Sequence, residues 1–90
     1  MCLFRKHKMF SVYILFSETT NRFYTGQCID LIKRMDQHNS GRNKSTKNGI
    51  PWRVVFVKQC ITRTDAVRLE RKIKDRGAFR YLNESETAVG

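Results

Sequence analysis

Alternating apolar residues near the N-terminus constrain the fold of this chain more than any other feature of its sequence. Residues 10–16 are rich in β-branched and aromatic types, and every second position is apolar, which predicts a strand with one apolar face: Phe10, Val12, Ile14 and Phe16. The polar stretch 17–22 predicts a hairpin loop, and residues 23–26 predict the returning strand. If Glu18 and Thr19 form a two-residue turn, Tyr13 lies directly opposite Tyr24, and both project from the other face of the hairpin.

The rest of the sequence predicts two helices and a third strand. Asp30 is a suitable N-cap for a helix over residues 31–38, which ends at a cluster of Asn, Ser and Gly. Residues 41–49 predict an exposed loop with no large apolar residue to tie it to the core, and residues 52–61 predict a strand. Thr62 or Thr64 caps a second helix over residues 65–75, and Gly77 ends it.

The resulting order is β-β-α-β-α, with a third helix allowed by some helical character, though no firm pattern, over residues 78–90, and this order predicts the fold class. We expect an α/β protein of the α+β type, with a small three-stranded sheet, partly antiparallel and flanked by helices that bury its apolar faces. A chain of 90 residues has room for one core. We therefore expect a flexible extension over residues 1–9, one domain over residues 10–84 and a frayed tail over residues 85–90.

The charge balance favours a polyanionic partner. Lys and Arg number 18 against 8 Asp and Glu, a net charge of +10. Nucleic acid is the commonest polyanion that a protein binds, with acidic membranes and ribosomal contacts as alternatives. Cys2, Cys28 and Cys60 lack the C-x-x-C spacing of zinc and redox sites, so we expect reduced thiols. Because the N-terminal charges interrupt any signal-peptide pattern, we expect a soluble, cytoplasmic protein that does not bind membranes.

Two residues of the first predicted helix are candidates for a binding or catalytic pair. Arg34 and His38 are four residues apart and share one face, which we place away from Leu31. Such a pair either acts on one ligand or belongs to a solvated basic face. Asp30 lies four residues before Arg34 and is spaced for a surface ion pair with it.

A carboxylate in the second predicted helix is the candidate metal ligand. Glu70 falls at the edge of the apolar stripe of Ala66, Leu69 and Ile73, inside a strongly basic segment. It either holds a divalent cation against a phosphate that the surrounding charges attract, or forms an ion pair with Lys74 one turn later.

The two strand tyrosines also allow two interpretations. Tyr13 and Tyr24 either pack their rings and leave the hydroxyl groups in water, or one of them acts as a general base beside a metal and an arginine.

Taken together, these positions resemble a known family. The segments SVY at residues 11–13 and YTG at residues 24–26 resemble the paired motifs of the GIY-YIG endonucleases, above all the small stand-alone bacterial members related to the nuclease domain of the excision-repair incision subunit. Arg34 and His38 follow at the family's spacing, and Glu70 matches its acidic residue. Ser11 and Thr25 depart from the motifs at positions without a chemical role. Asn83 is the candidate for the family's late asparagine.

The resemblance implies a GIY-YIG nuclease-like domain over residues 10–84 that hydrolyses phosphodiester bonds in DNA with one Mg²⁺ or Mn²⁺ ion, in DNA repair or recombination. It implies that Glu70 holds the metal, Arg34 stabilises the phosphorane charge, and Tyr24 takes the proton from water. Tyr13 would then position that water, with His38 relaying or orienting. Five further residues are the expected nucleic-acid contacts: Gln27, Arg42, Lys44, Lys47 and Arg53.

Two other functions fit the same charge. A basic module of this kind either clamps nucleic acid without cutting it or serves as a ribosome-associated structural protein. Dependence of activity on a divalent metal discriminates among the three. The choice between DNA and RNA, the form of the substrate and the oligomeric state stay open at this point.

Overall fold

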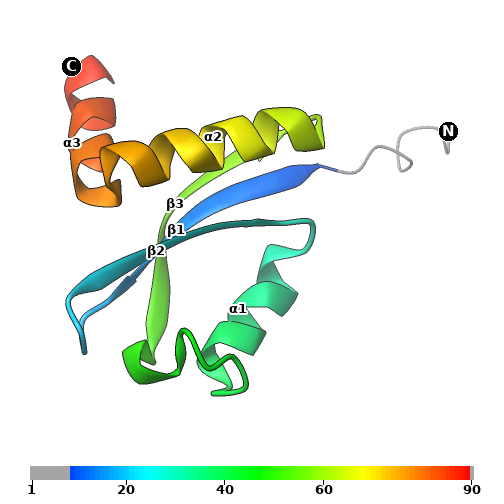
Figure 1. The fold of residues 1–90 in the computed structure, drawn as a ribbon, viewed down its shortest axis with the longest axis vertical. Coiled ribbons are helices and arrows are strands. Elements are labelled where there is room, and N and C mark those ends of the chain that lie inside the picture. The colour runs from blue at the N-terminus through cyan, green and yellow to red at the C-terminus, as the bar shows by residue number, and fades with distance from the viewer. Residues whose placement is uncertain (1–8, 90) are drawn as a thin grey trace, which may run out of the picture.

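The structure is a computed structural model that describes residues 9–89, and Figure 1 shows its architecture. Three strands form one sheet in the order β2-β1-β3, and both neighbouring pairs are antiparallel. The α+β class and the predicted order of elements are therefore confirmed. The elements are β1 (Phe10–Ser17), β2 (Arg22–Cys28), α1 (Leu31–Asn39), the 3-10 turn η2 (Lys47–Gly49), β3 (Trp52–Cys60), α2 (Arg63–Arg76) and α3 (Ala78–Val89).

The predicted extension over residues 1–9 lies, apart from Met9, outside the described residues, and the proposed domain limits stay predictions. Helix α3 continues to Val89, where the sequence showed no firm pattern. Of the thiols expected to be reduced, Cys28 and Cys60 are free and buried, and Cys2 lies outside the described residues. None of the helices in the described part of the chain is long and apolar enough to cross a membrane.

The central strand β1 is buried on both faces. Val12 and Ile14 face α2 and α3 in one apolar cluster, whereas Tyr13 and Leu15 face α1 in another, and all four side chains are inaccessible to solvent. Figure 1 shows α1 on one side of the sheet and α2 with α3 on the other. The sheet is thus the middle layer of three, and it divides the buried apolar residues into two clusters where the chain length had predicted one core.

The β1–β2 hairpin differs in register from the prediction. Tyr13 pairs with Gly26 and Leu15 with Tyr24, and a four-residue turn over residues 18–21 replaces the predicted two-residue turn. The turn is wider because Asn21 adopts a left-handed conformation (φ 59°) that asparagine tolerates, and its N–H donates to the Ser17 carbonyl at 2.7 Å. The register shift equals two residues, so both tyrosines keep the same face and lie as diagonal neighbours.

Both predicted helix caps are present. The Asp30 carboxylate accepts from the Lys33 N–H at 3.1 Å and caps α1, and the Thr62 hydroxyl accepts from the Asp65 N–H at 3.1 Å and caps α2. Helix α2 ends at Gly77, whose φ of 92° lies in the region that glycine favours. The caps fix where each helix begins, and therefore which side chains face the sheet.

The loop over residues 41–49 is exposed at most positions, as predicted, but the expectation that nothing ties it to the core is wrong. Thr46 is 2% exposed, and its carbonyl accepts from the Trp52 indole N–H at 2.7 Å. Gly49 is buried against the Trp52 ring, where any Cβ would overlap the indole. The anchor is the side chain of a residue outside the loop, so the composition of the loop itself did not reveal it.

Candidate active site

A buried hydrogen-bond chain lies between β1, α1 and the loop. The Tyr13 hydroxyl and His38 Nε2 are 3.1 Å apart, and His38 Nδ1 is 3.2 Å from Thr46 Oγ1. Because the Thr46 hydroxyl donates to the Asn43 carbonyl, its oxygen accepts from the Nδ1–H of a neutral His38. Nε2 is then the acceptor for the Tyr13 hydroxyl, and the phenol proton is held by the imidazole.

Of the two alternatives for His38, the solvated basic face is excluded by its burial. His38 is 1% exposed, because it lies seven residues after Leu31 and three after Met35, on the face that packs against the sheet. Our placement of this face away from Leu31 is therefore corrected. Arg34 is half-buried, and the surface ion pair expected between it and Asp30 does not form within the described residues.

The pKa values of this cluster follow from burial and from Arg34. Burial and the proximity of Tyr24 raise the pKa of Tyr13 to about 12, against an opposing effect of the Arg34 charge. Burial, together with the Arg34 charge, lowers the pKa of His38. Both groups are neutral at pH 7, as the hydrogen-bond chain requires. Burial also raises the pKa of the Cys28 thiol, which keeps it protonated.

Tyr24 completes the cluster from the edge strand. Its ring lies edge-on to His38 at 4.9 Å between centroids and 6.4 Å from the Tyr13 ring. The side chain is half-buried, whereas Tyr13 is fully enclosed. The idea that both hydroxyl groups reach water is therefore wrong for Tyr13. Gly26 of the YTG segment is required here, since a Cβ on it would lie 2.7 Å from the Tyr13 hydroxyl oxygen.

Glu70 lies on the opposite side of the sheet, on α2, and reaches β2 through an amide. Gln27 Nε2 donates to Glu70 Oε1 at 2.9 Å, and Lys74 Nζ lies 2.8 Å from Oε2, so the predicted ion pair exists. Burial raises the pKa of Glu70, but the hydrogen bonds from Lys74 and Gln27 and the Lys74 charge outweigh it and lower the pKa overall. The carboxylate is therefore charged at neutral pH, with 20% of its side chain exposed.

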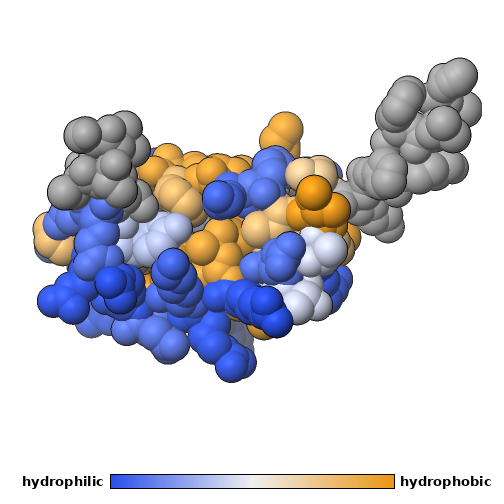
Figure 2. Space-filling model, turned by 90° about the horizontal axis from the view of Figure 1, so that it is seen from above, coloured by the Kyte–Doolittle hydropathy of each residue, from blue (hydrophilic) through white to orange (hydrophobic). Residues whose placement is uncertain are grey.

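The expected nucleic-acid contacts are dispersed. Gln27 lies at the site, whereas Arg42, Lys44 and Lys47 are exposed on the anchored loop beside α1. Arg53 is exposed on β3, 3.3 Å from a Glu18 carboxylate oxygen. Figure 2 shows a broad band of hydrophilic side chains beside an apolar area on the face seen from above. Asn83, the candidate late asparagine, is exposed on α3.

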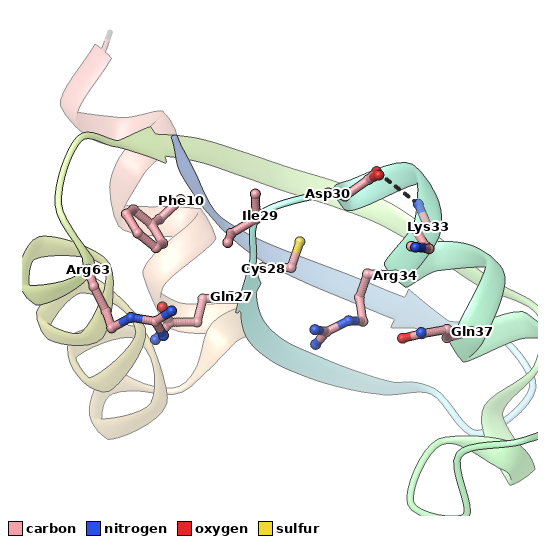
Figure 3. A pocket seen from close by; sticks show the side chains of 9 residues that line it. All are labelled: Phe10, Gln27, Cys28, Ile29, Asp30, Lys33, Arg34, Gln37 and Arg63. Atoms are coloured by element: carbon pink, nitrogen blue, oxygen red, sulfur yellow. Dashed lines mark hydrogen bonds between the residues drawn. The ribbon is translucent and has the colours of Figure 1, made fainter. Parts of the chain in front are cut away.

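One residue beside the site was not anticipated from the sequence. Arg63, the first residue of α2, lines a hollow together with Gln27 and Arg34, as Figure 3 shows. It precedes Glu70 by seven residues, or about two helical turns, and this spacing is the signal that would have found it. The site therefore spans both sides of β2.

The fold and this geometry define a class of small α+β domain in which two strand tyrosines, a helix arginine and a helix carboxylate surround an edge strand. The model of the GIY-YIG catalytic domain matches residues 9–83, and the chain belongs to this family. The resemblance seen in the sequence is thereby confirmed.

The chain is similar to several UPF0213 proteins. One from Pseudomonas aeruginosa PAO1 is 37% identical over 68 residues, which are 74% of this chain and 64% of the relative, so the chain spans about two thirds of that protein's length. One from Listeria innocua is 33% identical over 70 residues, 73% of this chain and 78% of the relative. The solution NMR structure of a UPF0213 protein from Bacillus halodurans has a TM-score of 0.52 at 28% identity and covers 90% of this chain and 84% of that one.

Proposed function

We propose that this protein is a metal-dependent endonuclease that hydrolyses phosphodiester bonds in DNA, with a place in DNA repair or recombination. The observation that carries the proposal is the placement of Glu70. It is an ionised carboxylate, held by Gln27 of the strand that also carries Tyr24, inside a chain of net charge +10. A charged carboxylate repels a polyanion but attracts a cation, so in such a basic surface it is suited to bind a metal ion.

The donor set fits one Mg²⁺ or Mn²⁺ ion. Within residues 9–89, no group of three or more His, Cys, Asp or Glu side chains is arranged to hold a metal. Mg²⁺ usually keeps several waters and is bound through one or two carboxylates and the phosphates of the substrate, which is what a single Glu70 allows. When bound, the ion would supply stabilisation of charge on the leaving 3′ oxygen. Lys74, with 56% of its side chain exposed, is free to leave Glu70 for a phosphate.

The remaining roles follow from exposure and charge. Tyr24 lines a hollow beside Lys74, so water and a phosphate reach it, and it takes the proton from the attacking water. Arg34 places a permanent positive charge where the pentacovalent phosphate gains negative charge. Tyr13, with its proton held toward His38, keeps the ring of Tyr24 in position, and His38 orients Tyr13.

A second candidate function is a nucleic-acid-binding module without catalysis. The observation that favours it is the ion pair between Lys74 and Glu70, which occupies the carboxylate in the absence of substrate. In that case Glu70 stabilises α2 and takes no part in chemistry.

The test is cleavage of labelled branched, single-stranded and duplex DNA, with RNA of the same sequence, in Mg²⁺, Mn²⁺ or EDTA. We expect cleavage only with metal, and expect Glu70→Gln to abolish it while binding persists or strengthens, because one repelling charge is lost. Glu84→Gln is the matched control, since Glu84 is also a carboxylate in an ion pair: it lies on α3 and pairs with Arg76 of α2. Equal cleavage by Glu70→Gln and the wild type would rule out the metal role, and metal-independent binding without any cleavage would favour the binding module.

A further inference from the structure

A hollow of about 250 Å³ opens at the end of β2, beside the site (Figure 3). Its walls come from the start of β1, the end of β2, the first turns of α1 and the first residue of α2. Three cations line it against one carboxylate, and that carboxylate, Asp30, already accepts from the Lys33 N–H. The charged lining residues are Asp30, Lys33, Arg34 and Arg63. The hollow is therefore electropositive and suited to an anion.

Two guanidinium groups point toward each other across this hollow. Figure 3 shows Arg34 entering from α1 and Arg63 from α2, with Gln27 beside Arg63. The Arg63 guanidinium lies over the Phe10 ring, 5.1 Å from its centroid, which restricts its position. Neither arginine forms an ion pair with a carboxylate in the described part of the chain. Two such donors on opposite walls match an oxyanion with several acceptors, above all a phosphate.

The hollow adjoins the catalytic carboxylate through Gln27. The Gln27 side chain lines the hollow and also donates to Glu70 at 2.9 Å, so the hollow begins where the proposed metal site ends. Arg34, assigned to the scissile phosphate, forms the opposite wall. The anion that arrives there together with a scissile phosphate is the neighbouring phosphate of the same strand.

We propose that this hollow binds the phosphate next to the scissile one, and that Arg63 is a positioning residue that sets which bond enters the site. The proposal rests on the proposed endonuclease function. Because Arg63 holds a non-reacting phosphate, its removal weakens binding and misplaces the strand without removing a group from the chemistry itself.

The test combines a change in the protein with a change in the substrate. Oligonucleotides carry one neutral methylphosphonate at successive positions, and their binding is measured in EDTA, where no metal-dependent cleavage occurs. For the wild type, we expect one position beside the cleavage site to lose about tenfold or more in affinity, as the loss of a charge-assisted hydrogen bond does. With Arg63→Met, natural DNA should lose affinity to a similar extent, and the methylphosphonate at that position should cost nothing further.

Arg68→Met is the matched control, because Arg68 is an exposed arginine on the same helix that lines a different, outer groove. It should weaken binding but leave the methylphosphonate effect unchanged. Additive losses for Arg63→Met and the methylphosphonate, or a flat methylphosphonate scan of the wild type, would overturn the proposal. The methylphosphonate scan of the wild-type protein tests the proposal even if the Arg63→Met variant does not fold. A non-additive result in a protein that cuts no DNA with any metal would leave the phosphate site standing and refute the endonuclease.

Discussion

Tyr13→Phe isolates the contribution of the buried hydroxyl that links the sheet to α1. The phenylalanine ring occupies the same space in the core, so packing is kept and only the oxygen is lost. In the wild type this hydroxyl donates to His38 Nε2 at 3.1 Å, in a position without solvent access. After the substitution, Nε2 is a buried acceptor with no donor.

The expected loss of stability follows from the unpaired Nε2 atom of His38. Leaving one buried polar atom unpaired costs about 1–3 kcal/mol, and part of this is regained because the hydroxyl no longer has to be desolvated. We therefore expect a loss of about 1–2 kcal/mol in the free energy of unfolding, out of a total of about 5–15 kcal/mol for a typical domain. For a chain of this length, the melting temperature should fall by about 4–8 °C for each kcal/mol.

The assay is urea unfolding at pH 7, followed by circular dichroism, with an unchanged dependence on denaturant concentration as the sign of an unchanged fold. Tyr24→Phe is the matched control: Tyr24 is half-buried on the neighbouring strand, and its hydroxyl makes no hydrogen bond to the described residues. Its loss should stay within about 0.5 kcal/mol. Equal effects of the two substitutions would refute the hydrogen-bond chain as a source of stability.

Three further outcomes are expected. Burial lowers the pKa of His38 below its ordinary value of 6.5, so the neutral side chain contributes to stability above pH 6.5. This contribution is lost as the pH falls through the pKa of His38 in the folded state. Urea unfolding from pH 8 to 5, together with an NMR titration of the ring, measures the loss. Arg34→Ala should lower the cleavage rate about 10²- to 10³-fold but weaken binding far less; equal losses would make it a phosphate anchor only. Replacing Arg42, Lys44 and Lys47 by alanine should flatten the slope of log affinity against log salt by about 0.7–0.9 per lost contact, equally for unrelated sequences.

The local fold was predictable where one chemical pattern decides it. The period-two pattern of β1 identified the two faces of the hairpin, and a single capping side chain, Asp30, marked the start of α1. The turn was misjudged because its geometry depends on Ser17 and Asn21 rather than on its length. The sequence indicated helix α3 only as an option, because the evidence that fixes it is tertiary: its residues pack on the sheet, as Tyr81 does on Phe56, with ring centroids 5.5 Å apart.

The candidate site, like the fold, was predictable where sequence spacing decides it and not where tertiary packing does. Arg34 and Glu70 were found from the sequence because their spacing matches the family motifs. The burial of His38 was missed, although its separation of seven residues from Leu31 places both on one face of the helix. The contacts from Gln27 to Glu70 and from Thr46 to His38 join residues 43 and 8 positions apart through the fold. No rule of residue spacing predicts the contact from Gln27 to Glu70, because the packing of α2 against β2 depends on the whole core.

In the proposed function, the position of β2 at the edge of the sheet lets the two halves of the site act together. Side chains alternate along a strand, so Tyr24 faces α1 whereas Gln27 faces α2, and a central strand would keep two such groups on separate surfaces. At an edge strand, both faces open on the same side of the molecule, so one strand of the proposed nucleic-acid substrate would contact both. Tyr13 lies on the central strand and is sealed there with a pKa of about 12, so it is suited to hold its neighbours. The same reasoning makes Tyr24, on the edge, the tyrosine that a water molecule and a phosphate can approach together.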